Sequence, residues 1–427
     1  MCLGEPEKLG LICVGTCFEG GTMYRIAEII GNERAPSHIA EISFHPSGSY
    51  FAATYENIDE VRIFDSRTRK LLQVLENPES QIYNPHGVLF TEKYLLISNA
   101  HDFSKPGTIN VYRNGSTITK PIQIFQSPFS HLREPHSLAL RDGRLVVTYA
   151  ENVAPSGAIV SFGFNEETGK ITCVLDKTES WFSEYGDPKG LCFSADGTKI
   201  FVTFRSNKQF SAVKKLIRAI ASDGGLPVPT RLMNFSNKAI RKLKNKFWQS
   251  SRAFNNSLRE IGSESSVELE KPNPQYVTPT KNGLAIFSIN AEGKIGRRPG
   301  QVIVRKDFCR LENIDVFGGT CVVTDTVNHL LLLYDLTQDQ NFTCPFHTVH
   351  FGNATPHAAK FSPDGRLLVI SSLGRKVVNQ ELDFFDWASP REDKIFVLER
   401  SKLAPTHGAG VRVGSKADMC SAQVDVR

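Results

Sequence analysis

The most informative feature of this chain is a strand–turn–strand pattern that occurs six times. Its clearest copy is "TPHAAKFSPDGRLLVISSLG", in which a Pro-His pair precedes a short apolar strand, a Ser-Pro-Asp-Gly turn and a second strand. A Pro-Asp-Gly turn is typical of a tight reversal between two antiparallel strands. The six copies lie at residues 37–57, 84–102, 134–152, 187–207, 311–328 and 355–374.

A third apolar run follows each copy, as in "VRIFDS", "TINVYR" and "KIFVLER", and a fourth usually follows that, as in "KLLQVLE" and "PIQIFQS". A four-stranded unit that repeats about every 45–50 residues indicates a β-propeller blade. A single sheet cannot cover both of its faces, whereas radial stacking buries each sheet between its neighbours and leaves only short edges. We therefore predict an all-β, six-bladed β-propeller over residues 9–400.

The two ends of the chain are expected to close the ring together. The segment "MYRIAEIIGNERA", residues 23–35, precedes the first complete unit and matches a fourth strand, whereas the last unit has three clear strands and no strong fourth. The economical solution is that the N-terminal strand completes the last blade. A further strand candidate, "LICVGT", leaves a composite seventh blade as an alternative.

Blade four is interrupted by residues 208–281. Residues 208–252 hold eleven Lys or Arg and one acidic residue, hence about +10, against +5 for the whole chain. In the segment 237–261 the residues Ile240, Leu243, Phe247 and Phe254 fall on one helical stripe, and residues 211–221 are also helix-like. We expect a basic α-helical insertion that packs on the propeller, docks on an anionic membrane surface or binds an acidic partner through residues 211–252. Residues 401–427 are expected to form a C-terminal tail.

The composition favours a soluble chain with reduced cysteines. No run of eighteen apolar residues occurs, and the first residues lack the basic segment and cleavage site of a signal peptide. The nine cysteines are odd in number and show no CxxC spacing, which favours thiols over a disulfide framework or a zinc ribbon. We therefore expect a cytoplasmic protein. The sequence contains no P-loop, no Gly-x-Ser-x-Gly or His-Glu-x-x-His motif, and no strong nucleic-acid motif.

The repeats resemble those of known propellers. The units "PHAAKFSPDGRLLVI" and "DPKGLCFSADGTKIFV" are similar to repeats of the lactonase-type and YVTN-type β-propellers, which are WD40-like in shape. The segment "VGTCFEGG" is similar to the "VGTYTxGG" opening of the lactonase-type family. The resemblance implies the fold and suggests a lactonase-like hydrolase as one activity. No catalytic residue of that family is carried over, because its motif has no match here, and propellers host enzymes and binding platforms alike.

Histidine recurs where the first strand of a blade begins, and first strands line the central channel of a propeller. The residue four positions before the Phe or Leu of that strand is His86, His136, Lys189, Asn313 and His357 in blades two to six. In blade one this position is Ala40, but His38 lies two residues earlier and so on the same side. Further polar residues follow the second strands, which return to the same end of the channel: Glu56, His101, Asp102, Glu151, Arg205, Asp325 and Arg375.

Three hypotheses account for these polar residues. In the first, Pro-His is a structural device, and the imidazole bonds a backbone carbonyl of the next blade. In the second, the channel mouth of a binding platform takes a small polar or anionic ligand or a partner segment. The alternative within this hypothesis is a lactonase-like hydrolase or isomerase, with His86, His136 and His357 as acid or base and Lys189 and Arg205 as charge partners. In the third, His38, His86, His136 and His357 bind a divalent metal ion.

Overall fold

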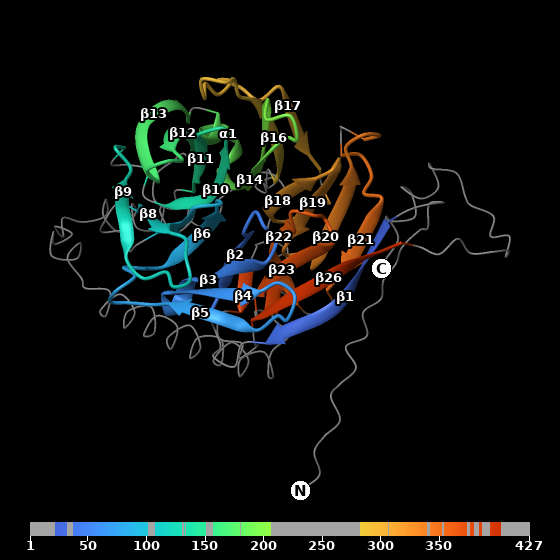
Figure 1. The fold of residues 1–427 in the computed structure, drawn as a ribbon. Helices are drawn as coiled ribbons and strands as arrows, with labels where there is room; N and C mark the ends of the chain where they lie inside the picture. Colours follow the sequence, from blue (N-terminus) through green and yellow to red (C-terminus); the bar gives the residue numbers. More distant parts are fainter. Residues whose placement is uncertain are drawn as a thin grey trace, which may run out of the picture.

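The computed structural model of the chain defines a set of β-sheets and the segments that join them (Figure 1). It describes residues 22–31, 37–100, 107–129, 132, 134–150, 157–179, 181–205, 282–305, 307–339, 342–351, 354–373, 376–379, 384–386 and 393–402. Six of the sheets have four strands each, and in five of them the strands follow one another in chain order.

Blades one to three come from the first half of the described chain. Blade one comprises β2 (Ile39–Phe44), β3 (Tyr50–Tyr55), β4 (Glu60–Asp65) and β5 (Leu71–Leu75), with the 3-10 turn η1 (Glu56–Ile58) after β3. Blade two comprises β6 (Pro85–Phe90), β7 (Tyr94–Asn99), β8 (Thr108–Arg113) and β9 (Pro121–Gln126). Blade three comprises β10 (Pro135–Arg141), β11 (Arg144–Tyr149), β12 (Ala158–Asn165) and β13 (Lys170–Thr178).

The remaining blades include one built from both ends of the chain. Blade four, preceded by the short helix α1 (Phe182–Tyr185), comprises β14 (Asp187–Phe193), β15 (Lys199–Arg205), β16 (Gly283–Ser288) and β17 (Gln301–Val304). Blade five comprises β18 (Leu311–Phe317), β19 (Thr320–Asp325), β20 (Leu330–Asp335) and β21 (His347–His350). Blade six comprises β22 (Thr355–Phe361), β23 (Leu367–Leu373), β26 (Lys394–Lys402) and β1 (Thr22–Gly31); the strands β24 (Lys376–Asn379) and β25 (Phe384–Asp386) pair separately between β23 and β26.

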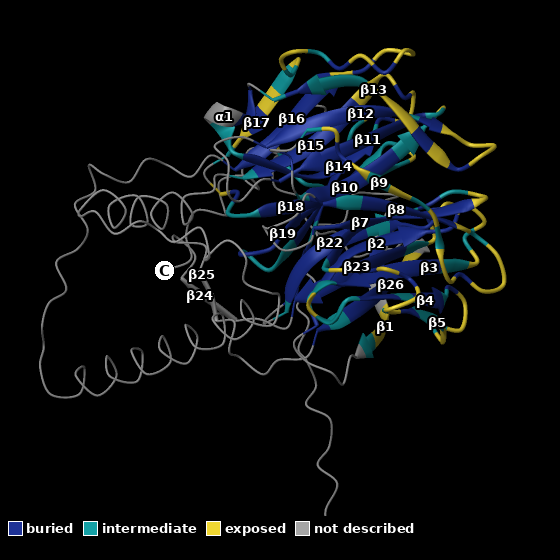
Figure 2. Cartoon of the chain, turned by 90° about the vertical axis from the view of Figure 1, so that its left-hand side faces the viewer, coloured by how far each residue is buried: buried dark blue, intermediate teal, exposed yellow. Residues whose placement is uncertain are grey.

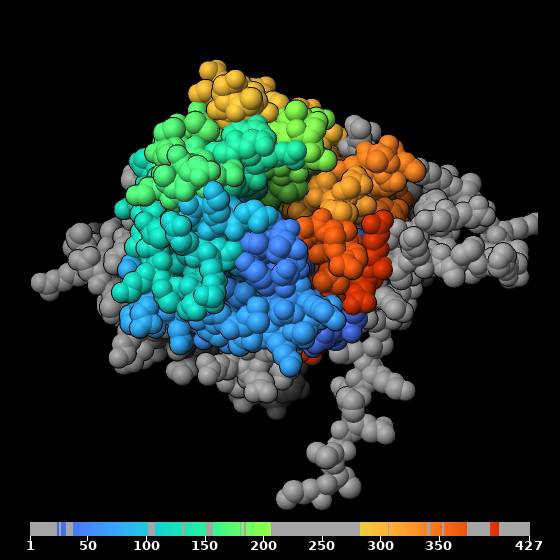
Figure 3. All heavy atoms as spheres, viewed as in Figure 1, coloured from blue at the N-terminus to red at the C-terminus, as the bar shows by residue number. Residues whose placement is uncertain are grey.

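The blades form a closed ring around their first strands. Contacts link β2 to β6, β6 to β10, β10 to β14, β14 to β18, β18 to β22, and β22 back to β2. In Figure 3 the sectors follow one another in chain order, and the first and last sectors meet. The molecule is therefore a six-bladed β-propeller, as the six repeats predict.

The hydrophobic core lies between neighbouring blades, as radial stacking requires. One cluster joins Ala52, Val61 and Ile63 of blade one to Leu95 and Ile97 of blade two. Because inner strands are covered on both faces, β2 and β7 are buried along their whole length, whereas the outer strand β9 alternates between half-buried and exposed residues. Figure 2 shows the same gradient from the centre of the molecule to its rim.

Strand β1 closes the ring by pairing antiparallel with β26, and Figure 1 shows the two strands side by side. The buried Tyr24 hydroxyl donates to the carbonyl of Gly365, which lies 341 residues later in the chain. Gly365 occupies the Ser-Pro-Asp-Gly turn with φ +66°, a conformation that favours glycine. The predicted closure by the N-terminal strand is thus confirmed, and the segment "LICVGT" lies outside the described residues.

The two ends of the blade-four insertion are held together by the sheet, because Phe204 of β15 pairs with Gly283 of β16. This pairing agrees with the predicted position of the insertion between the second and third strands. The predicted helices of residues 208–281 and the predicted tail of residues 401–427 fall on residues outside the described ranges, apart from the end of β26.

Candidate functional site

A repeated hydrogen bond identifies equivalent residues in the six inner strands. Each first strand bulges near its start, and a backbone N–H at the bulge donates to a Ser or Thr hydroxyl on the second strand of the same blade. The N–H and hydroxyl pairs are Glu41/Thr54, Gly87/Ser98, Ser137/Thr148, Gly190/Thr203, Asn313/Thr324 and Ala358/Ser371. These pairs define equivalence by geometry, without reference to the sequence pattern.

The same hydroxyls join each blade to the next one. Those of blades one to five donate to the backbone carbonyls of His86, His136, Lys189, Glu312 and His357, in that order. Together with Ala40, the residue that precedes Glu41, these five residues form one layer around the axis, which we call the inner ring. All five are buried, with exposures of 4 %, 4 %, 1 %, 2 % and 4 %.

The inner ring corrects one sequence prediction. The spacing assigned Asn313 to blade five, but the hydrogen bonds assign Glu312 to the ring and place Asn313 one residue further along β18. The reason is that Ile314, where pairing resumes after the bulge, lies three positions before Phe317, whereas Leu191 lies two positions before Phe193 in blade four. Counting back from the Phe therefore gives a position shifted by one residue.

The structure brings the four candidate histidines of the mouth together. The ring centroids of His86 and His136 are 3.5 Å apart, and those of His86 and His357 are 5.8 Å apart. His38 provides the imidazole of blade one, where the inner ring has Ala40, with its centroid 5.2 Å from His357 and 6.5 Å from His86. Each of the six blades thus contributes one polar side chain to the same region.

His38 is held in a conformation that few residues adopt. Its φ is +54°, in the left-handed region that costs a non-glycine residue free energy. Asp393 of blade six accepts its backbone N–H at 2.6 Å and also the N–H and hydroxyl of Ser37, at 2.6 and 2.7 Å. Glu56 lies 2.7 Å from Nδ1 of the imidazole. Two carboxylates therefore fix both the backbone and the ring of His38.

Three ring nitrogens in this cluster are buried without a hydrogen-bond partner among the described residues. They are Nε2 of His38 and Nδ1 of both His86 and His136. His357 differs, because its Nδ1 lies 2.7 Å from the carbonyl of Ala40 in the next blade. The structural hypothesis therefore fits His357, while each of the other three rings has a nitrogen that makes no hydrogen bond with the described residues.

The buried imidazoles favour their neutral forms. Burial lowers the pKa of His86 to about 4, although Glu56 opposes the shift. Burial also lowers the pKa of His136 and of His357 well below the usual value, and the neighbouring His86 contributes in both cases. A neutral imidazole offers one donor and one acceptor, so this cluster can both give and receive hydrogen bonds.

Blades four and five contribute the charged part of the inner ring. Burial and the nearby Arg205 lower the pKa of the Lys189 amine. Although burial opposes it, Arg205 and Arg310 hold the pKa of Glu312 well below its usual range. Nη1 of Arg205 lies 2.6 Å from Oε1 of Glu312, and Arg310 pairs with the same oxygen.

Glu134 adds an acidic group that the sequence pattern did not single out. It lies two residues before His136, and its carboxyl interacts electrostatically with Lys189, Glu56, Asp187 and Arg205. Burial raises the pKa of Glu134 to about 7, and the interaction with Lys189 offsets part of this rise. A carboxylic acid that titrates near neutrality can exchange a proton under physiological conditions.

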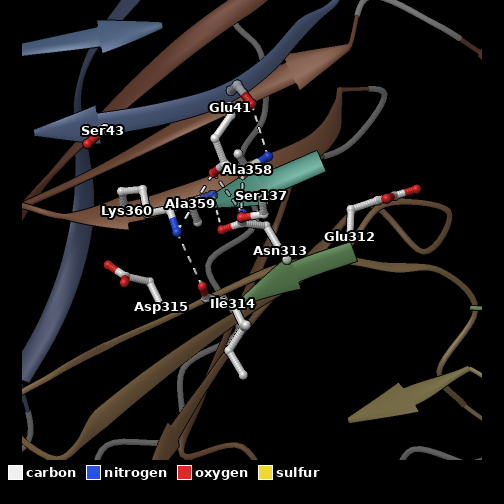
Figure 4. Close-up of polar contacts among 12 residues, drawn as sticks. Glu41, Ser43, Ser137, Glu312, Asn313, Ile314, Asp315, Ala358, Ala359 and Lys360 are labelled. Carbon is white, nitrogen blue, oxygen red and sulfur yellow. Dashed lines mark hydrogen bonds and ion pairs between the residues drawn. The ribbon is translucent and has the colours of Figure 1, made fainter. Parts of the chain in front are cut away.

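The next layer of the axis is crossed by polar side chains, as Figure 4 shows. From β2, the carboxylate of Glu41 accepts hydrogen bonds from the hydroxyl of Ser137 at 3.2 Å and the amide of Asn313 at 2.8 Å, on two other blades. Nζ of Lys360 lies 3.7 Å from the same carboxylate. Burial raises the pKa of Glu41, and the nearby carboxylates of Glu41 and Asp315 raise that of Lys360 despite its burial.

This axial network was missed by the sequence reasoning, although a signal for it exists. Glu41 and Lys360 are acidic and basic residues in the strands "IAEISF" and "TPHAAKF", which are otherwise free of formal charge apart from His357. The amide of Asn313 also accepts the N–H of Ala359 at 3.2 Å, so Asn313 belongs to this network.

The other candidate residues have different outcomes. Glu56 and Arg205 lie in the cluster, as described above. The carboxylate of Asp325 instead accepts the backbone N–H groups of Cys309 and Arg310 at 3.1 and 3.0 Å, and so shapes the loop that carries Arg310. The remaining candidates, which are His101, Asp102, Glu151 and Arg375, lie outside the described residues, as does the basic insertion 211–252.

The described ranges contain no clear metal-binding group and no membrane-spanning helix. No group of three or more His, Cys, Asp or Glu side chains in these ranges has an arrangement that could hold a metal ion. The predicted metal site of His38, His86, His136 and His357 therefore gains no support from the described residues. None of the helices in the same ranges is long and apolar enough to span a membrane.

Comparison with known proteins identifies the fold and no family. No family model matches the chain, and no curated protein matches it. Among solved structures, a luciferin-regenerating enzyme is similar with a TM-score of 0.52 and 10% identity, covering 92% of this chain and 99% of its own. Hydrazine synthase of Kuenenia stuttgartiensis has a TM-score of 0.44 and 12% identity, covering 88% and 98%. In total 1028 solved chains match, so the shape alone does not select a function.

Proposed function

We propose that this protein is a β-propeller that binds a small polar ligand among the histidines at one end of its central channel. The observation that carries the proposal is the set of three buried ring nitrogens, on His38, His86 and His136, that have no partner among the described residues. A buried polar atom without a hydrogen bond costs free energy, so such atoms require an explanation. A ligand with both donors and acceptors would satisfy them.

The layer below supports binding at this end of the channel. Glu41 and its partners Ser137, Asn313 and Lys360 cross the axis next to the inner ring. A ligand among the histidines would therefore rest on this network. Its polar groups would meet the imidazoles on blades one, two, three and six, and the amine of Lys189 and the carboxylate of Glu312 on the other two blades.

Thermal shift assays and ¹⁵N spectra of the histidine rings test the proposal. The probes are a panel of small lactones, hydroxy acids, amides, polyols and inorganic anions. A binding compound should raise the melting temperature of the wild-type protein and shift the signals of His86 and His136. His86→Ala and His136→Ala should lose this response, and the control His350→Ala, on the exposed end of β21, should keep it. Equal responses in all four proteins, or none in any, would contradict the proposal.

A lactonase-like hydrolase is the second candidate, and Glu134 is the observation that favours it. The lowered pKa of His86 makes its imidazole a weak base at neutral pH, whereas the pKa of Glu134, at about 7, suits general acid–base work. The guanidinium of Arg205 would then stabilise negative charge on the reacting oxygen, and the amine of Lys189 would donate a hydrogen bond to it. Lactone and ester hydrolysis should be measured from pH 5 to 9. If the protein is such a hydrolase, the activity should change near pH 7 and be lost in Glu134→Gln. A rate that does not vary with pH and is the same in the variant excludes the hydrolase.

A further inference from the structure

Among the described residues, the amine of Lys189 has no hydrogen-bond or ion-pair partner, unlike that of Lys360, the other lysine near the axis. Lys189 is 1 % exposed, and its backbone carbonyl accepts the hydroxyl of Thr148. Lys360, by contrast, has the carboxylate of Glu41 within 3.7 Å and the carbonyl of Ile314 at 3.4 Å. Two lysines of one propeller thus have opposite environments.

The surroundings of Lys189 favour a neutral amine. Burial and the cationic Arg205 lower its pKa, while Glu134, Glu312 and Asp187 oppose the shift. The guanidinium of Arg205 is itself paired with Glu312 at 2.6 Å, which weakens the attraction of Glu312 for the amine. A desolvated lysine next to another cation is a common environment for an amine that attacks carbonyl groups, because only the neutral amine is a nucleophile.

The position of Lys189 directs this reactivity to the proposed ligand. Its α-carbon occupies the inner-ring position of blade four, equivalent to that of His136 in blade three, as the hydroxyls of Thr148 and Ser98 show. Lys189 also interacts electrostatically with both His86 and His136. Glu134 provides an acid close to the amine.

We infer that Lys189 forms a covalent Schiff base with a small aldehyde or ketone bound among the histidines. The amine nitrogen attacks the carbonyl carbon and forms a C–N bond, and one of its two protons passes to the carbonyl oxygen, which becomes a hydroxyl group. Protonated Glu134 then gives its proton to that hydroxyl, the C–O bond breaks, and water leaves. The second proton of the nitrogen passes to the Glu134 carboxylate and restores the acid, so the step consumes one carbonyl and one amine and yields one imine and one water. The inference rests on the proposed function, because it identifies the chemical class of the ligand.

Reductive trapping on the full-length protein tests the inference. Propanal and sodium cyanoborohydride are added near pH 7, and the modified lysines are identified by peptide mass spectrometry. The pKa of Lys189 is lowered and that of Lys360 is raised. Because each unit of pKa difference changes the neutral fraction roughly tenfold at this pH, Lys189 should be labelled roughly tenfold faster than Lys360 or more. The exposed Lys93 reports the rate of an ordinary surface amine. Labelling of Lys189 no faster than that of Lys360 overturns the inference.

Two variants separate this result from the proposed function. Lys189→Met preserves the length and removes the amine, and should abolish the fast label while the slow labelling of Lys93 continues. Glu134→Gln should slow the labelling of Lys189 more than that of Lys93. If the panel compounds still bind but Lys189 does not react, the ligand site stands and the Schiff base is wrong. If Lys189 reacts but His86→Ala and His136→Ala leave its labelling unchanged, the amine is reactive without the histidine site.

Discussion

Acid should destabilise this propeller through its buried imidazoles, and His86 allows the effect to be calculated. The pKa of His86 falls from 6.5 to about 4 on folding because burial disfavours the cation. Between these two values the unfolded chain binds a proton that the folded protein does not. The stabilisation is therefore complete above pH 6.5 and is lost as the pH falls toward 4.

The size of this loss follows from the pKa difference. One pKa unit corresponds to about 1.4 kcal/mol, so the full shift of His86 is worth roughly 3 kcal/mol. Most of it is lost between pH 7 and pH 5, where His86 alone should remove about 2 kcal/mol from the free energy of unfolding. His136 and His357 act in the same direction, since burial lowers the pKa of both.

Urea unfolding at pH 7, 6 and 5 measures the effect. The variant His86→Gln has no group to titrate, so its free energy of unfolding should fall by about 2 kcal/mol less than that of the wild type over this range. His350→Gln is the matched control because its side chain is exposed on β21, and it should follow the wild type. If His86→Gln and the wild type lose the same free energy between pH 7 and pH 5, the imidazole is not buried in its neutral form and the reasoning fails.

Three further predictions concern stability. Thr148→Val should lower the free energy of unfolding by about 1–3 kcal/mol in urea titrations, because it leaves two buried backbone groups without their hydroxyl partner. Glu41→Ala should cost about 3–5 kcal/mol, because Lys360 keeps a buried charge, and the double change of both residues to Met should recover most of this loss. Tyr24→Ala should cost about 3 kcal/mol or more and expose β1 to limited proteolysis before the rest of the ring, whereas simultaneous cleavage of all blades would contradict the role of β1 as a closing strand.

The fold could be predicted from the sequence because the strand repeats and the turn motifs indicate the same architecture. Each repeat carries its own strand periodicity and reversal, and only one radial arrangement buries six such units. The closing strand was also predictable, since "MYRIAEII" lacked a partner of its own and the last blade lacked a fourth strand. The register of blade five could not be predicted, because the stretch between the bulge of β18 and its Phe317 is one residue longer than the equivalent stretch in the other blades. A count of residues cannot reveal such a bulge.

Only those residues of the candidate site that occupy an equivalent position in each repeat could be predicted from the sequence. His86, His136, Lys189 and His357 occupy one equivalent position, and the repeat itself brings them together. His38 depends on a left-handed backbone conformation that Asp393, from the other end of the chain, maintains. Residues so far apart in the sequence leave no local pattern that would predict their contact. The hydrogen bond of Glu41 with Asn313 is another example, because it forms only once the ring has closed.

The pairing of β1 with β26 has a consequence for how the chain folds during its synthesis. Tyr24 emerges from the ribosome 341 residues ahead of Gly365, whose carbonyl accepts a hydrogen bond from the tyrosine hydroxyl. At usual rates of synthesis this delay lasts roughly 20 to 70 s. Throughout that time the nascent chain carries an edge strand whose proper neighbour has not been made, and a β-strand of another chain can occupy its place. Slow translation anywhere between Tyr24 and Gly365 lengthens this delay and should therefore increase misassembly.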